Sequence, residues 1–298
     1  MAKLDDLHHL NLGKRTRLHR MMYEHGPGNG TLLILPIDQG MEHGPVDFFT
    51  EHDCLNPEYQ FRLAVEGGYS AIALHLGLAE KYGPKFAGKI PIVLKINGKT
   101  RIPSGNDPVS AMTGSVEDAV RIGADAVGYT LYVGSPKQHM DFTQFRKVKE
   151  DAERYGMPII VWAYPRGDAV ESKGGRDSLY AIDYAARVSD ELGADVVKLN
   201  VPMTSAKSRS MQPPPYDTLN LSTEEMVAKV VKSAGKALVI FSGGGMVTDE
   251  EVIERAKICM DQGATGLIFG RNIWQRDWDD ALKIVKTLKD IILEAGES

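Results

Sequence analysis

The chain has 298 residues, of which 43% are hydrophobic and 25% are charged, a composition typical of a globular protein with one large or two small domains. Its net charge of -5 argues against non-specific nucleic-acid binding, and no apolar run approaches the ~20 residues of a membrane span. The polar N-terminus lacks the apolar core of a secretory signal, and Cys54 and Cys259 have no metal-site spacing. We therefore expect a cytoplasmic protein with two isolated thiols, no nucleic-acid partner and no membrane partner.

Eight apolar runs predict strands, and segments with helical character separate them. The runs are nearly continuous rather than alternating, as expected for strands that are buried on both faces of a parallel sheet. They are Thr31–Ile37, Tyr69–Leu76, Ile90–Ile96, Ala126–Leu131, Pro158–Trp162, Ala194–Leu199, Ala237–Phe241 and Thr265–Phe269. Eight strand–helix units in one chain predict an α/β fold, a single (β/α)8 TIM barrel over residues 31–298. Residues 1–30 are expected to form an N-terminal extension packed on it.

Local signals predict where several helices begin and end. Capping-box patterns begin at Ser115, Ser222 and Thr248, and glycines that can end a helix precede four of the predicted strands. The segment 200–221 is long and contains proline and serine, so it is a candidate lid or subunit contact.

Lys198 ends the sixth predicted strand, and it is the most informative residue of the chain. A lysine is costly to bury unless it is paired or used, and burial lowers its pKa and makes a neutral amine available. From chemistry alone three roles stay open: a nucleophile, a cation that binds phosphate, or a structural ion pair. Lys95, at the end of the third strand, is a direct rival for the first role.

The fifth predicted strand ends in a second group of candidates. Tyr164 is expected beside Lys198, where an ammonium group would lower the pKa of the phenol and suit it to acid–base chemistry. Alternatively, its hydroxyl only caps a backbone group at the barrel rim. Trp162 is either core or substrate wall, and Arg166 is either a phosphate clamp or a solvated cation.

Glycine turns follow the last two strands. Ser242, Gly243 and Gly244 end the seventh strand, and Gly270 and Arg271 follow the eighth. Because glycines let backbone N–H groups approach an anion closely, we predict a phosphate site here, as barrels often have at this position. The alternative is that the glycines only make tight turns.

Acidic residues and a histidine follow the first strand. Asp38, Glu42 and His43 raise the possibility of a divalent metal site, but only His75 is a clear further ligand candidate. Asp38 is better interpreted as a proton acceptor or as a partner that positions the lysine. Glu42 and His43 would then order the loop. We predict no metal ligand among these residues.

Four motifs together resemble the archaeal-type class I fructose-bisphosphate aldolases, a family that also occurs in bacteria. The similarity extends from about Leu32 to about Trp278. The motifs are Pro36-Ile37-Asp38-Gln39-Gly40-x-Glu42-His43-Gly44-Pro45, Trp162-x-Tyr164-Pro165-Arg166-Gly167, Ala194-Asp195-Val196-Val197-Lys198 and Ser242-Gly243-Gly244.

The resemblance implies a Schiff-base aldolase that needs no cofactor or metal, acts on a phosphorylated sugar, and forms a homo-oligomer, commonly a decamer. It implies that Lys198 is the Schiff-base lysine, Tyr164 the proton-transferring residue and Asp38 the acidic residue near the lysine. Trp162 and Arg166 fall on substrate-contact positions. The implied phosphate site of dihydroxyacetone phosphate comprises Ser242, Gly243, Gly244, Gly270 and Arg271. We add Lys95 and His43 as candidate contacts of the substrate and its second phosphate.

Other functions remain open at this point. Related lysine enzymes of the same superfamily include 2-amino-3,7-dideoxy-heptulosonate synthase and the thiolase that acts on phosphorylated autoinducer-2. A phosphate-binding isomerase or decarboxylase barrel would need no covalent lysine. A non-enzymatic phosphosugar-binding barrel is the most distant alternative.

Overall fold

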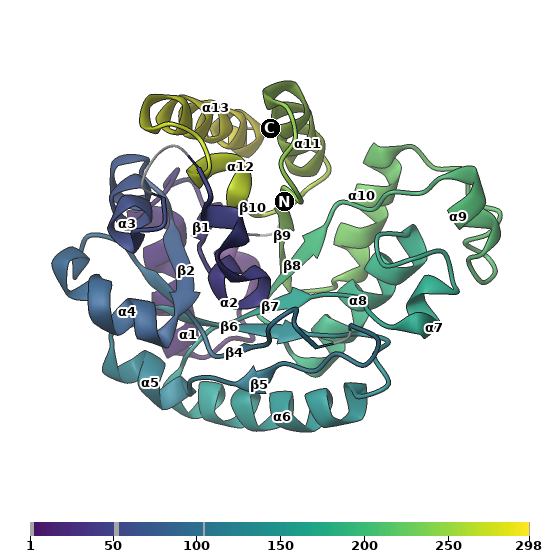
Figure 1. The fold of residues 1–298 in the computed structure, drawn as a ribbon, viewed down its shortest axis with the longest axis horizontal. Helices are drawn as coiled ribbons and strands as arrows, with labels where there is room; N and C mark the ends of the chain where they lie inside the picture. Colours follow the sequence, from purple (N-terminus) through teal and green to yellow (C-terminus); the bar gives the residue numbers. More distant parts are fainter. Residues whose placement is uncertain (1–2, 51–53, 104, 298) are drawn as a thin grey trace.

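Eight parallel strands close into a barrel in the computed structural model, which describes residues 3–50, 54–103 and 105–297 (Figure 1). Each strand overlaps one of the eight predicted runs, so the predicted (β/α)8 barrel is confirmed. The order around the barrel is β1-β10-β9-β8-β7-β6-β3-β2. The strands are β1 (Leu32–Pro36), β2 (Ala71–His75), β3 (Ile92–Lys95), β6 (Ala126–Leu131), β7 (Ile159–Ala163), β8 (Val196–Asn200), β9 (Leu238–Ser242) and β10 (Gly266–Ile268).

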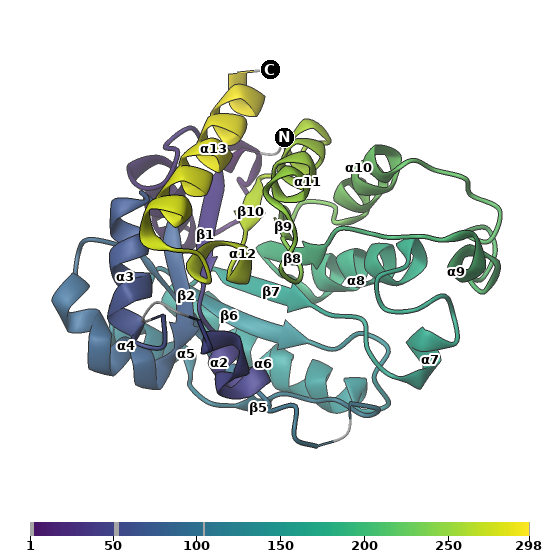
Figure 2. The same ribbon diagram turned by 45° about the horizontal axis from the view of Figure 1, so that its top comes forward.

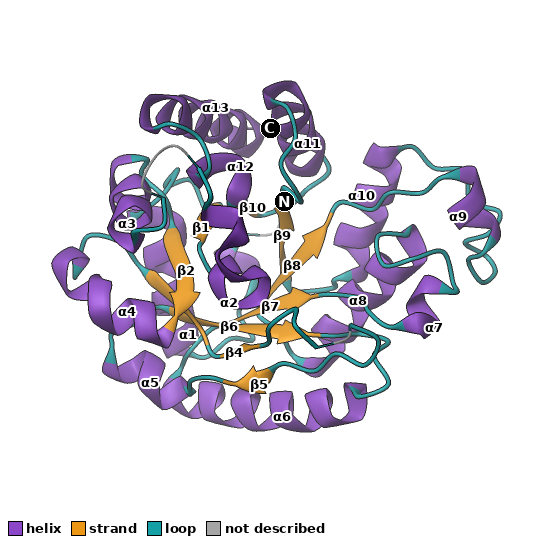
Figure 3. Ribbon diagram, viewed as in Figure 1, coloured by secondary structure: helices purple, strands orange, loops and turns teal. Residues whose placement is uncertain are grey.

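One principal helix follows each strand and covers the outside of the barrel (Figure 3). The three predicted capping boxes are present at the N-termini of α5, α10 and α11. The principal helices are α3 (Pro57–Glu66), α4 (Leu76–Tyr82), α5 (Val116–Arg121), α6 (Gln138–Tyr155), α8 (Leu179–Leu192), α10 (Thr223–Ser233), α11 (Asp249–Asp261) and α13 (Trp278–Glu297). In the described ranges no helix combines the length and apolarity that a membrane crossing requires.

Shorter elements lie in the loops at the two ends of the barrel. The views of Figures 1 and 2 place α7 (Asp168–Glu171) and α9 (Ala206–Ser210) at the same edge, beyond the ends of β7 and β8. The others in the loops are α2 (Gln39–His43), η3 (Gly44–Phe48), η4 (Gly83–Phe86), α12 (Arg271–Trp274) and the hairpin of β4 (Asn97–Gly98) and β5 (Ala111–Met112). Before β1 lie η1 (Leu4–Asp6), α1 (Leu12–His19) and η2 (Arg20–Glu24).

The N-terminal segment packs against the interior of the barrel at the N-terminal ends of the strands. Its buried apolar side chains belong to one cluster with interior residues such as Leu32 and Val196; they are Leu4, Leu7, Leu18, Met21 and Met22. A second cluster lies between the sheet and the outer helices. The division of the chain into an extension and a barrel stays a prediction, and Met1 and Ala2 lie outside the described residues.

A buried ion pair fixes this segment to the barrel. Lys14 on α1 has no exposed surface, and its Nζ lies 2.9 Å from Asp195 and 2.6 Å from Glu153. Asp195 in turn accepts a hydrogen bond of 2.8 Å from the backbone N–H of Ile159. The ion pair therefore links α1 to the starts of β7 and β8.

The strand register decides which side chains reach the functional end. Trp162, Lys198 and Ile240 are aligned on neighbouring strands, and Trp162 and Ile240 belong to the interior cluster. Aligned residues of parallel strands face the same side, so Lys198 also points into the barrel. Asn200 and Ser242 are aligned two residues further along and form the next interior layer toward the C-terminal ends.

Candidate active site

A pocket of about 850 Å³ opens at the C-terminal ends of the strands. This is the end at which barrels of this architecture hold their functional groups. Every predicted site residue except Lys95 lines it: Asp38, His43, Trp162, Tyr164, Arg166, Lys198, Ser242, Gly243, Gly244, Gly270 and Arg271. The fold therefore brings together residues that are up to 233 positions apart, from Asp38 to Arg271.

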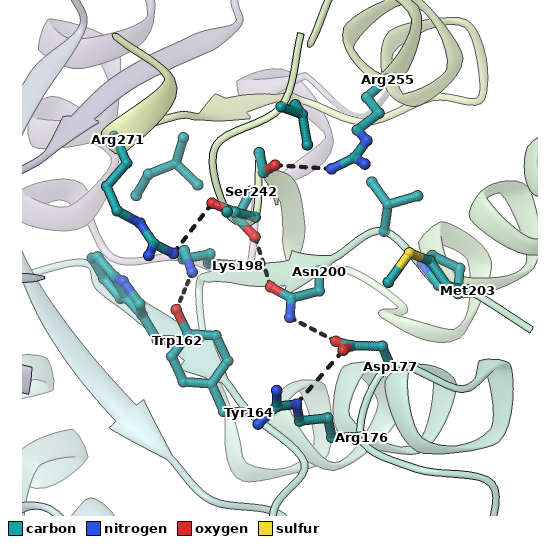
Figure 4. Close-up of a pocket in the computed structure, with 18 of the residues that line it drawn as sticks. Trp162, Tyr164, Arg176, Asp177, Lys198, Asn200, Met203, Ser242, Arg255 and Arg271 are labelled. Atoms are coloured by element: carbon teal, nitrogen blue, oxygen red, sulfur yellow. Dashed lines mark hydrogen bonds and ion pairs between the residues drawn. The ribbon is translucent and has the colours of Figure 1, made fainter. Parts of the chain in front are cut away.

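Lys198 is only 4% exposed, and its Nζ donates a hydrogen bond to the hydroxyl of Tyr164 (Figure 4). Burial lowers the pKa of Lys198 from 10.5 to about 7, as the sequence predicts, whereas the carboxylates of Asp38 and Glu42 oppose this shift. Much of the amine is therefore neutral near pH 7, as a nucleophilic lysine requires.

Tyr164 differs from its expected behaviour. The prediction that its neighbour lowers the pKa of the phenol is wrong: burial raises the pKa of Tyr164 well above 10, and the nearby carboxylates of Glu42 and Asp38 add to the rise. The guanidinium of Arg166, whose Cζ lies 4.9 Å from the centre of the Tyr164 ring, only partly offsets it. The resting phenol is protonated, which suits it to donate a proton.

Lys95 lies behind the pocket wall. Its side chain has no exposed surface, donates a hydrogen bond of 2.6 Å to Thr130 Oγ1, and lies 3.7 Å from the carboxylate of Asp38. The ring of Trp162 lies beside both lysines, with its centre 5.2 Å from Lys95 Nζ and 6.0 Å from Lys198 Nζ. The predicted contact of Lys95 with a second phosphate is therefore not supported, because Lys95 is paired inside the barrel.

Hydrogen bonds to its carbonyl groups hold the glycine turn after β9 in place. Gly244 has a φ of +74°, a conformation that favours glycine. Arg255 on α11 donates a hydrogen bond of 3.0 Å to the carbonyl of Gly243, and Arg271 donates one of 3.4 Å to that of Gly244 (Figure 4). Because these donors hold the carbonyl groups of the turn, its backbone N–H groups are free to bind an anion.

Asn272 supports the same turn from beneath. It is 1% exposed, donates a hydrogen bond of 3.0 Å to the carbonyl of Gly245, and accepts one of 3.0 Å from the N–H of Val247. At Gly270 a Cβ would lie 3.0 Å from the carbonyl oxygen of Pro36, so the turn after β10 also needs glycine. Together these contacts form a rigid cradle that fits the predicted phosphate site.

Further basic side chains line the pocket. Arg166 donates a hydrogen bond of 2.7 Å to the carbonyl of Pro165, and His43 pairs with Asp47. Arg101 and Arg176 add two cations to the pocket lining. Among the described residues, no group of three or more His, Cys, Asp or Glu side chains is placed to hold a metal ion.

Several residues of the pocket are not predicted from the sequence. Glu42 lines the pocket and raises the pKa of Lys198, whereas the sequence predicts only that it orders the loop. Asn200 lies two positions after Lys198, so the strand period could have placed it on the same face. Asp177 and Arg255 lie in a loop and in a helix and carry no such signal.

Comparison with known proteins agrees with this geometry. The family model described as DeoC/LacD family aldolase matches residues 32–276. The class 1 fructose-bisphosphate aldolase of Thermoproteus tenax is 37% identical over 264 residues, which cover 88% of this chain and 90% of that protein. That of Halobacterium salinarum is 35% identical over 249 residues, which cover 84% and 86%.

Solved structures give the same result. A Schiff-base-forming fructose-1,6-bisphosphate aldolase has 35% identity and a TM-score of 0.78, and the match covers 95% of this chain and 100% of the other. An archaeal aldolase whose catalytic Lys is covalently bound to the carbinolamine intermediate has 34% identity and a TM-score of 0.79, with the same coverage. The chain therefore belongs to the DeoC/LacD family of aldolases.

Proposed function

We propose that the protein is a class I aldolase that reversibly cleaves fructose 1,6-bisphosphate to dihydroxyacetone phosphate and glyceraldehyde 3-phosphate, a step of glycolysis and gluconeogenesis. One observation carries the proposal: a buried lysine with a pKa of about 7 donates a hydrogen bond to Tyr164 beside a glycine cradle in one pocket. The chemistry needs a neutral amine, a proton carrier and a phosphate site, and this pocket offers a candidate for each.

The first half of the reaction forms an iminium. Neutral Lys198 attacks the C2 ketone, and the resulting carbinolamine loses its hydroxyl as water when Tyr164 supplies a proton. The phenolate of Tyr164 then lies beside the new cation, which offsets the cost of ionising a buried phenol. The carboxylate of Asp38 stabilises the same cation.

The second half uses the phenolate as a base. It removes the proton of the C4 hydroxyl while the C3–C4 bond breaks, the iminium accepts the electron pair as an enamine, and glyceraldehyde 3-phosphate leaves. Tyr164 returns its proton to C3, activates a water for attack on the iminium, and so regains its proton. The carbinolamine collapses to free Lys198 and dihydroxyacetone phosphate.

The remaining site residues bind the two ends of the substrate. The turns at Gly243, Gly244, Gly270 and Arg271 hold the phosphate next to C1, and Arg166 holds the phosphate on C6. Trp162 forms the floor of the pocket. We also propose that this chemistry proceeds without a metal ion or cofactor, in a cytoplasmic homo-oligomer with a decamer as the expected form.

Borohydride trapping tests the proposal. Dihydroxyacetone phosphate and borohydride should add the mass of the reduced adduct to the peptide that carries Lys198, and Lys198→Met should show no adduct. An adduct on Lys95 would contradict the assignment of the nucleophile. If EDTA abolishes activity and added metal restores it, the metal-independent chemistry is contradicted. If the enzyme turns over the substrate of a related superfamily enzyme faster than fructose 1,6-bisphosphate, the proposed substrate is wrong.

A further inference from the structure

A chain of polar contacts joins the end of β9 to the mouth of the pocket (Figure 4). The hydroxyl of Ser242 lies 2.7 Å from Asn200 Oδ1, and Asn200 Nδ2 lies 2.9 Å from Asp177 Oδ1. The guanidinium of Arg176 lies 3.7 Å from the other carboxylate oxygen of Asp177. These four residues line the pocket.

The carboxylate of Asp177 fixes the direction of the hydrogen bonds that join Asp177, Asn200 and Ser242. A carboxylate only accepts, so the NH2 group of Asn200 must face Asp177 and the carbonyl oxygen of Asn200 must face Ser242. An amide oxygen also only accepts, so the hydroxyl of Ser242 must donate its proton to Asn200. The backbone N–H of Met203, which lies 2.7 Å from the carbonyl oxygen of Asp177, holds Asp177 in place.

The proton of Ser242 is therefore already used. A serine hydroxyl has one proton and two lone pairs, so while it donates to Asn200 it cannot donate to a phosphate. Its lone pairs remain for a donor in the pocket. Ser242 is aligned with Asn200 in the interior layer just beyond Lys198, next to the turn that begins at Gly243.

We propose that Ser242 accepts a hydrogen bond from the free hydroxyl of the dihydroxyacetone phosphate half of the substrate, rather than binding its phosphate. Asn200 and Asp177 are positioning residues that hold Ser242 in the accepting state. The inference rests on the proposed function, because the hydroxyl belongs to that substrate. In this arrangement the backbone of the glycine turns binds the phosphate, and Ser242 distinguishes substrates that carry the free hydroxyl from those that lack it.

Three ligands separate the two roles of Ser242: dihydroxyacetone phosphate, acetol phosphate, which lacks the free hydroxyl, and inorganic phosphate. Direct binding to the wild type should favour dihydroxyacetone phosphate over acetol phosphate. In Ser242→Ala this preference should fall by about tenfold, the effect of one lost hydrogen bond, while the Kd of inorganic phosphate stays within about twofold. An equal loss of affinity for all three ligands, or an unchanged preference, would overturn the inference.

Asp177→Asn tests the positioning roles. An amide at position 177 can donate, so Asn200 is free to turn and Ser242 loses its fixed direction. The preference should fall as in Ser242→Ala, and the double variant should show no further loss. Additive losses, or weaker binding of inorganic phosphate by Asp177→Asn, would show that Asp177 does not act through Ser242.

Borohydride adducts keep the two proposals distinguishable. The wild type and each variant are trapped with dihydroxyacetone phosphate, and their thermal unfolding midpoints are compared to verify folding. If the adduct forms on Lys198 but the wild type binds dihydroxyacetone phosphate and acetol phosphate equally well, only the inference about Ser242 is contradicted. If the wild type forms no adduct, the proposed function is contradicted, and the inference rests on it.

Discussion

At the scale of single residues, the reactivity of Lys198 results from opposing effects on one amine. Removal from water lowers its pKa, the cations of Lys95 and Arg166 lower it further, and the carboxylates of Asp38 and Glu42 raise it. The balance leaves the pKa at about 7, and substitutions of the charged neighbours should move it in predictable directions.

The pH dependence of imine formation should follow this balance. In the wild type the trapping rate should rise as pH increases through about 7, because the neutral amine is the nucleophile. Lys95→Met removes a like charge and should shift the profile to higher pH. Asp38→Asn removes a carboxylate and should shift it to lower pH. Single-turnover borohydride trapping across the pH range measures both, and shifts in the same direction would contradict this account.

Removal of the Tyr164 hydroxyl should affect chemistry more than binding. We expect Tyr164→Phe to lower kcat by roughly 10²–10⁴-fold, the usual contribution of a general acid–base group. The borohydride adduct should still form on Lys198, more slowly. Tyr132→Phe is a matched control, since Tyr132 is also buried but does not line the pocket. An equal loss of kcat in both variants would contradict a catalytic role of Tyr164.

The sequence predicted which residues meet in the pocket better than it predicted their states. Lys198 and the glycine turns follow apolar runs, and the barrel brings the ends of all such runs to one face. The direction of the Tyr164 pKa shift depends on how deeply atoms from other loops bury the phenol. The pairing of Lys95 with Asp38 likewise depends on three-dimensional contacts that no local pattern records.

At the scale of elements, the turn after β9 is rigid because α11 and α12 hold its carbonyl groups. Asn272 and Arg255 belong to these helices and contact the turn without lying in it. This arrangement explains why a glycine-rich turn, which is intrinsically flexible, can present its N–H groups in one geometry. The β4–β5 hairpin was not predicted, because each of its strands has only two residues.

Loss of the amide at position 272 should loosen this turn. We expect Asn272→Ala to weaken the binding of inorganic phosphate by about tenfold, because the carbonyl of Gly245 and the N–H of Val247 lose their partner. Calorimetric titration measures the change. Asn220→Ala, in the loop before α10, serves as the control and should bind phosphate as the wild type does. Unchanged binding in Asn272→Ala would show that the turn keeps its shape unaided.

At the scale of the whole molecule, the N-terminal segment completes the interior of the barrel. The sequence predicted a packed extension, but not the burial of Lys14, because its partner Asp195 lies 181 residues away. The apolar residues of the segment share a cluster with the strands. We therefore expect the segment to unfold together with the barrel.

Breaking the ion pair tests this coupling. Asp195→Asn should lower the free energy of unfolding by about 3 kcal/mol, the low end of the range for a broken buried pair, because Glu153 still contacts Lys14. Glu153→Gln should cost less, within about 1 kcal/mol, since Glu153 is 45% exposed. Urea unfolding followed by circular dichroism gives both values. Two transitions in the wild type would contradict a single cooperative unit.

The bond between Lys14 and Asp195 has a consequence for how this scaffold can change over generations. Asp195 lies three residues before Lys198, directly before the first residue of β8. A slip of one position in β8 would turn the nucleophile out of the barrel and into the helical layer. Because the lower end of the strand is held by α1, the loops at the upper end are free to lengthen, shorten or exchange their polar residues without losing the lysine. New substrate preferences can thus arise in the loops at the C-terminal ends of the strands, while contacts at the N-terminal ends keep the nucleophile in place.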